Sequence, residues 1–171
     1  MRLSRNAIAA AVVLAAAAVQ APQAHAASSV ANAVGSCQGS LSMFDANLRK
    51  RPLGIQNVGT TSVFVSCGVQ WAFRPGLSPQ AYVTATNLNT TAVDLTCTLL
   101  DGYPVLTRIA YHPKTISIAA NSSASIVWLP WEQYDIADTF TNYENFSCHV
   151  PPGIEINRVG FDYTSYDAWN P

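Results

Sequence analysis

The stretch Val93-Asp94-Leu95-Thr96-Cys97-Thr98-Leu99 decides the fold, because its apolar and polar side chains alternate one by one. The stretch from Val63 to Val69 alternates in the same way. Successive side chains of a strand point to opposite faces, so this period of two predicts strands with one buried face. Further runs of strand-forming residues follow at 82–87, 115–119, 125–129, 146–150 and 154–163.

Turn-forming residues separate these runs and predict reversals of the chain at Asn87–Thr91, Asp101-Gly102, Asn121-Ser122 and Pro151-Pro152-Gly153. In the last run the apolar parity shifts after Ile156, which predicts a β-bulge near Asn157 and Arg158. About seven to nine short strands without a long amphipathic helix predict an all-β fold. We expect an antiparallel β-sandwich of Greek-key or jelly-roll-like type.

The first 26 residues carry the features of a signal peptide. Two arginines precede an unbroken apolar run from Ala7 to Val19, and Ala24-His25-Ala26 forms a small-x-small cleavage site. The apolar run falls short of the roughly 20 residues that span a bilayer, so cleavage is favoured over a membrane anchor. We therefore predict a signal peptide over 1–26, a flexible leader over 27–36 and a single β-sandwich domain over 37–171, with a short helix within 41–48.

All four cysteines, Cys37, Cys67, Cys97 and Cys148, follow the predicted cleavage site. An exported protein folds under oxidising conditions, and the spacings do not match common zinc-binding patterns, so two structural disulfides are predicted. Three pairings are possible. Pairing of sequence neighbours, Cys37 with Cys67 and Cys97 with Cys148, is preferred because it ties the leader to an early strand and an inner strand to a late one.

The charge composition excludes two classes of partner. Only 11% of the 171 residues are charged, against about 25% in an ordinary protein, and the formal net charge is −1. This balance offers no electrostatic basis for binding nucleic acid or an anionic membrane surface. The mature form is expected not to insert into a membrane.

The sequence contains few groups suited to catalysis. It has no Gly-x-Ser-x-Gly elbow, no His-Glu-x-x-His and no phosphate-binding glycine loop, so no catalytic residue, metal site or cofactor is predicted. His149 follows an inward Cys148 and should face solvent. His112 precedes Pro113 and fits an extended edge or a turn. The acidic residues Glu132, Asp135 and Asp138 cluster after Pro130, and a secreted hydrolase that works through Glu132 or Asp135 is kept as an alternative.

Aromatic side chains suggest a binding role. Trp131, Tyr134 and Trp169 fall in segments that the pattern assigns to loop or tail, whereas Trp128 lies in an apolar strand and should be core. Flat rings on loops can stack on sugar rings, and neighbouring Asn, Ser and Thr can supply hydrogen bonds. These three aromatic residues are the predicted ligand-binding set.

Four segments carry a resemblance to a known group: Gly54-Ile55-Gln56-Asn57, Val65-Ser66-Cys67, Val93-Asp94-Leu95-Thr96-Cys97 and Phe146-Ser147-Cys148-His149-Val150-Pro151. Together they resemble small exported two-disulfide β-sandwich proteins of Gram-negative bacteria, over most of residues 37–163. The resemblance implies a fold and a compartment. It brings no catalytic residues to this chain.

The leading hypothesis is a secreted or periplasmic, non-enzymatic binding module for carbohydrate or another envelope component. The first alternative is a structural or assembly protein whose exposed sheet edge accepts a strand from another envelope protein. The second alternative is the secreted hydrolase.

Overall fold

The computed structural model describes residues 29–69, 78–103, 108–129 and 144–164. Its strands are β1 (Ser29–Asn32), β2 (Cys37–Gly39), β3 (Leu48–Arg51), β4 (Gly54–Asn57), β5 (Val63–Gly68), β6 (Ser78–Asn87), β7 (Val93–Tyr103), β8 (Arg108–Ile118), β9 (Ser122–Trp128), β10 (Glu144–Val150) and β11 (Ile154–Thr164). Two short helices are α2 (Ala33–Ser36) and α3 (Ser42–Asp45). No helix among these residues is long and apolar enough to span a bilayer.

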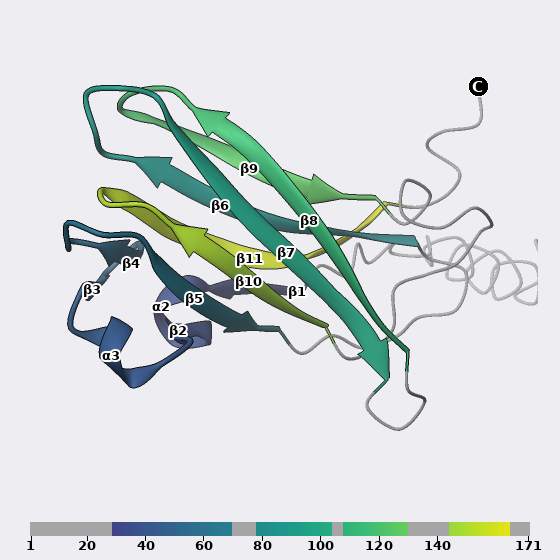
Figure 1. The fold of residues 1–171 in the computed structure, drawn as a ribbon. Helices are drawn as coiled ribbons and strands as arrows, with labels where there is room; N and C mark the ends of the chain where they lie inside the picture. The colour runs from purple at the N-terminus through teal and green to yellow at the C-terminus, as the bar shows by residue number, and fades with distance from the viewer. Residues whose placement is uncertain (1–28, 70–77, 104–107, 130–143, 165–171) are drawn as a thin grey trace, which may run out of the picture.

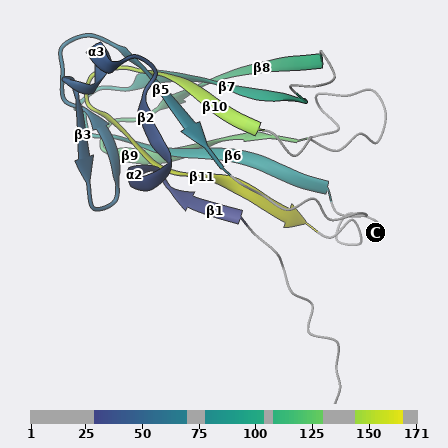
Figure 2. The same ribbon diagram turned by 90° about the horizontal axis from the view of Figure 1, so that it is seen from below.

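The strands form two antiparallel sheets, which Figure 2 shows as two layers. Sheet A has the order β3-β4-β11-β6-β9, with β1 beside β11, and sheet B has the order β2-β5-β10-β7-β8. The prediction of an antiparallel β-sandwich is therefore confirmed. Inward-facing side chains of both sheets make one core, in which Phe146 lies between Trp128 and Phe161, with ring centroids 5.7 and 5.8 Å apart. The prediction that Trp128 belongs to the core is also confirmed.

Among the pairs of consecutive strands that cross from one sheet to the other, four are joined by a turn of three to five residues, and we call each of these pairs an arch: β4–β5, β10–β11, β6–β7 and β8–β9. The arches follow the same order in both sheets, so they stack side by side. Their turns, 58–62, 151–153, 88–92 and 119–121, gather at one end of the sandwich, at the left in Figure 1. This end is called the arch end below.

Two buried asparagines tie neighbouring arches together. Asn57 Nδ2 donates to the carbonyls of Thr61 in its own turn and of Val150 in the next arch, both at 2.9 Å. Asn87 Nδ2 donates to Thr91 O at 2.8 Å and to Ile118 O at 2.9 Å. Each side chain therefore closes its own turn and joins it to an adjacent strand end.

The predicted strands over 63–69 and 93–99 are confirmed as β5 and β7, and the later runs as parts of β6, β8, β9, β10 and β11. The register of β11 against β6 shifts between Ile156 and Arg158, so the predicted bulge is confirmed. The turn predicted at Asp101-Gly102 is wrong. Both residues continue the β7 ladder opposite Ala110 and Ile109, and Asp101 is buried, because pairing with β8 overrides the local turn preference.

The N-terminal expectations need two corrections. Residues 29–36, predicted as part of a flexible leader, form β1 and α2; β1 pairs antiparallel with residues 158–161 of β11, and Ala33 is fully buried. The missing side chain of Gly160 in β11 allows that close approach. The helix expected within 41–48 is limited to α3, because Leu48 already begins β3.

Candidate functional site

The predicted ligand-binding residues Trp131, Tyr134 and Trp169 lie outside the described residues, as do Glu132, Asp135 and Asp138. The strands on either side of residues 130–143, which contain all of these except Trp169, are described. β9 ends at Trp128 and β10 begins at Glu144, and register places both at the end of the sandwich opposite the arch end.

The cysteines form the preferred pairs, Cys37–Cys67 and Cys97–Cys148. Each pair joins residues that lie directly opposite each other on neighbouring strands of sheet B. All four cysteines are buried. Because all four are disulfide-bonded, none of them offers a free thiol for chemistry. Two buried disulfides indicate an oxidising, extracytoplasmic environment.

Neither His112 nor His149 lies in a cluster suited to holding a metal. No group of three His, Cys, Asp or Glu side chains with that geometry occurs in the part of the chain that the structure describes. His149 is exposed, as predicted, and its ring lies 5.0 Å from that of Phe64 on the neighbouring strand. His112 lies on the edge strand β8, where its backbone carbonyl accepts a hydrogen bond from Trp128 Nε1 at 2.7 Å.

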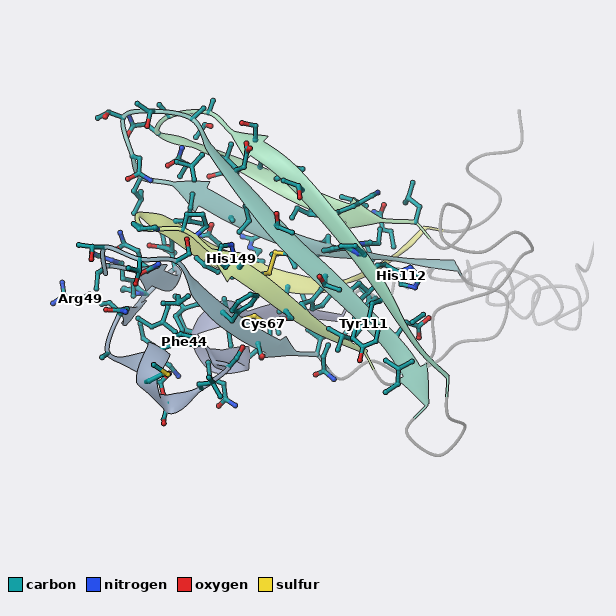
Figure 3. All side chains as sticks on the ribbon, viewed as in Figure 1. Phe44, Arg49, Cys67, Tyr111, His112 and His149 are labelled. Carbon is teal, nitrogen blue, oxygen red and sulfur yellow. A yellow bond between two sulfur atoms is a disulfide. The ribbon has the colours of Figure 1, made fainter. Side chains whose placement is uncertain are left out.

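The outer face of sheet B carries no Asp, Glu, Lys or Arg over three successive rows of side chains across β5, β10, β7 and β8. The rows are Phe64, His149, Thr96 and Thr115, then Ser66, Ser147, Thr98 and Pro113, then Gly68, Asn145, Leu100 and Tyr111. Asp94 lies beyond the first row, toward the arch end. Figure 3 views the molecule from this side, with His149 and Tyr111 labelled.

Apolar surface is exposed at both ends of this face. Phe64 is 47% exposed beside His149, and Tyr111 is 63% exposed on β8, next to the exposed Ile109. Hydroxyl groups lie between and around them: Thr96 Oγ1 and Thr115 Oγ1 are 2.7 Å apart, and Ser40 Oγ and Ser66 Oγ are 2.8 Å apart. The face thus combines exposed rings with neutral hydrogen-bonding groups.

The outer face of sheet A also carries hydroxyl pairs, Thr84 with Ser125 and Thr86 with Ser123, but it differs from that of sheet B because charged side chains lie beside them. Arg51 Nε donates to Gln56 Oε1, and Asn157 Nδ2 donates to Glu155 Oε1 at 2.9 Å. Thr86 Oγ1 donates to Asn157 Oδ1 at 2.8 Å. Glu155 is only 7% exposed. This network ties the charged side chains Arg51 and Glu155 to neighbouring amides.

The edge of the sandwich formed by β8 and β9 is closed by side chains. Lys114 Nζ donates to Val127 O at 2.7 Å, and Trp128 Nε1 covers His112 O. On the other side, β3 is short and carries Arg49, Lys50 and Arg51. Short, charged or capped edges discourage strand addition.

Sequence reasoning missed Phe64 and Tyr111. Both occupy the outward parity of their strands, where the alternation predicts polar residues, and an aromatic ring at such a position is the signal that could have found them. Their proximity to the hydroxyl rows depends on strands that are distant in sequence. No local pattern shows that arrangement.

The fold and this face define an antiparallel β-sandwich with two disulfides and an open, uncharged sheet surface. No protein-family model matches the chain, and no curated protein sequence matches it. Among solved structures, the GH26-CBM35 β-(1,4)-mannanase of Podospora anserina is similar at a TM-score of 0.38 with 8% identity. That match covers 80% of this chain and 28% of the mannanase chain.

Proposed function

We propose that this protein is an exported, non-enzymatic binding module for glycan or other cell-envelope material. The observation that supports this function is the outer face of sheet B, with its exposed rings, its hydroxyl groups and its three rows without Asp, Glu, Lys or Arg. Sugar rings offer C–H faces that stack on aromatic side chains and hydroxyls that exchange hydrogen bonds with Ser, Thr and Asn.

The closed edges favour this function over strand-mediated assembly. A partner strand on β8 would meet a carbonyl already occupied by Trp128 Nε1. A strand on β3 would meet three basic side chains. Light scattering during size-exclusion chromatography tests the alternative, since a concentration-dependent oligomer would support assembly and a monomer at all concentrations would support the binding module.

The binding function is tested with a glycan array and a pull-down with purified envelope polysaccharide. We expect Phe64→Ala to weaken binding about tenfold, because the sugar loses the aromatic ring on which it stacks. Leu88→Ala is the matched control: Leu88 is also 47% exposed but lies at the arch end. Loss of binding in Trp131→Ala or Trp169→Ala, with Phe64→Ala unaffected, would assign the ligand to the predicted loop site instead. Failure of the wild-type protein to bind any glycan or envelope polymer would reject the function.

The export part of the proposal rests on the signal-peptide pattern of residues 1–26. Mass spectrometry of the protein recovered from outside the cytoplasm should show a chain that begins at Ala27. Recovery of the full-length chain from the cytoplasm would contradict export.

A further inference from the structure

We infer that the ligand is a neutral, extended glycan chain that lies obliquely across the outer face of sheet B, from the Phe64–His149 pair, over Thr98, to Tyr111. This inference rests on the proposed function and adds the charge, the shape and the direction of the ligand.

The charge of the ligand follows from the composition of the face. A carboxylate or sulfate brought onto these rows would lose water without gaining a cationic partner, which is unfavourable. The three basic side chains of β3 belong to sheet A, not to this face. A neutral sugar carries no such penalty, and the hydroxyls of Thr96, Thr98 and Ser147 can donate to it and accept from it.

The direction follows from the register. His149, Thr98 and Tyr111 lie on three neighbouring strands, and each step from one to the next moves one strand across and two residues along. With strands about 4.8 Å apart and about 3.3 Å per residue, the line from His149 to Tyr111 is roughly 16 Å long. An exposed ring group lies at each end, with a threonine between them.

The length of that line sets the length of the ligand. A single sugar can contact only one end, whereas an extended oligosaccharide can contact both rings at once. Contact with the second ring adds binding energy without the translational cost of a second association. Affinity should therefore rise with chain length and level off once the chain reaches Tyr111.

The first measurement is affinity electrophoresis of the full mature chain in gels that contain hydroxyethyl cellulose, soluble β-1,3-glucan, starch or polygalacturonate. We expect retardation by at least one of the three neutral polymers and none by anionic polygalacturonate. Added salt should leave the retardation unchanged, because no ion pair is involved. Preference for polygalacturonate would overturn the inference of a neutral ligand and leave the glycan-binding function intact. Binding to none of the four would count against both.

The second measurement is calorimetric titration with oligosaccharides of increasing length from the retained polymer. Tyr111→Ala should reduce the affinity for long oligosaccharides about tenfold and leave that for the shortest binding one unchanged, whereas Phe64→Ala should weaken all lengths. Leu88→Ala should behave as wild type. If affinity does not depend on length, or if Tyr111→Ala changes nothing while Phe64→Ala weakens binding, the oblique path is wrong and the binding function stands.

Discussion

Asn57 and Asn87 show how single side chains hold this fold together. Both are fully buried, and both use one amide group to close a turn and to reach the neighbouring strand end. Their Oδ1 atoms accept the backbone N–H of Gly59 and Asn89, at 3.0 and 2.9 Å. An apolar side chain at either position would leave these buried backbone groups without partners.

We predict that Asn57→Ala and Asn87→Ala each lower the free energy of unfolding by about 3 kcal/mol, since each variant loses a donor to at least two carbonyls and an acceptor for at least one N–H. Chemical denaturation measures the change. Asn145→Ala is the control, because Asn145 is an exposed strand residue whose replacement should shift stability by less than about 0.5 kcal/mol. Equal effects at buried and exposed positions would contradict the role of the buried amides.

Tyr82 gives a pH-dependent prediction. Burial raises the pKa of its phenol above the ordinary value of 10.0; Asp162 adds to the rise, and Arg158 opposes it. The unfolded chain therefore releases this proton at lower pH than the folded protein does. The corresponding stability is fully present below the unfolded pKa and is lost as the pH rises through the folded pKa.

Tyr82→Phe should accordingly lose less stability than the wild type between about pH 9 and about pH 11. Denaturant midpoints measured across that range provide the comparison. Parallel curves for the two proteins would show that Tyr82 makes no contribution to the alkaline loss of stability.

At the scale of elements, β1 depends on a close approach that only glycine allows. A Cβ atom at Gly160 of β11 would lie 2.6 Å from Ser29 O and 3.1 Å from Val30 Cα. The backbone of β1 occupies the space that any larger side chain would need.

We predict that Gly160→Val displaces β1 from sheet A and costs about 1–3 kcal/mol. Hydrogen exchange should show loss of protection over residues 29–32, while β6, on the other side of β11, stays protected. Gly35→Ala is the matched control, since no atom lies within 4 Å of the added Cβ, and its exchange pattern should remain that of the wild type. Protection of 29–32 in the Gly160→Val protein would overturn the prediction.

The alternation of side chains predicted β5 and β7 correctly. A strand with one buried and one exposed face has alternating apolar and polar residues, and this pattern is visible within a short stretch of sequence. The same reasoning failed at Asp101-Gly102, where a turn-forming pair is held in a strand by its pairing with β8. It failed again at residues 29–36, whose small side chains carry little pattern and are ordered by contact with β11. Elements fixed by distant partners cannot be found in local patterns.

At the scale of the whole molecule, strands β4 to β11 form a stack of four arches, and a spacing in the sequence reflects part of this stack. Asn57, Thr61 and Cys67 recur 30 residues later as Asn87, Thr91 and Cys97, at equivalent places in the arches β4–β5 and β6–β7. The order of the arches is not visible in this way. The order depends on β10 and β11, which come last among the described strands. Their arch lies between the arches β4–β5 and β6–β7 in both sheets. The candidate binding face depends on that position, since it brings His149 beside Phe64.

The two disulfides act on different parts of this stack, although their chain-entropy contributions are similar. They span 30 and 51 residues, for which the loop-closure model gives about 4 kcal/mol each. Cys97–Cys148 joins two arches in the middle of sheet B. Cys37–Cys67 holds β2, a three-residue edge strand, and with it the segment that contains β1 and α2.

We therefore predict two different outcomes when each pair is replaced by alanine. Loss of Cys97 and Cys148 should lower the global free energy of unfolding. This disulfide links β7 to β10 in the middle of sheet B, and these two strands separate only when the whole sandwich unfolds. Loss of Cys37 and Cys67 should also permit local opening of residues 29–39, with hydrogen exchange there well above the global rate, since few other contacts retain so short an edge. Uniform exchange rates across the molecule in the second variant would show that β1, α2 and β2 open only with the rest of the sandwich. In that case the N-terminal segment would be as integral to the stack as the arches themselves.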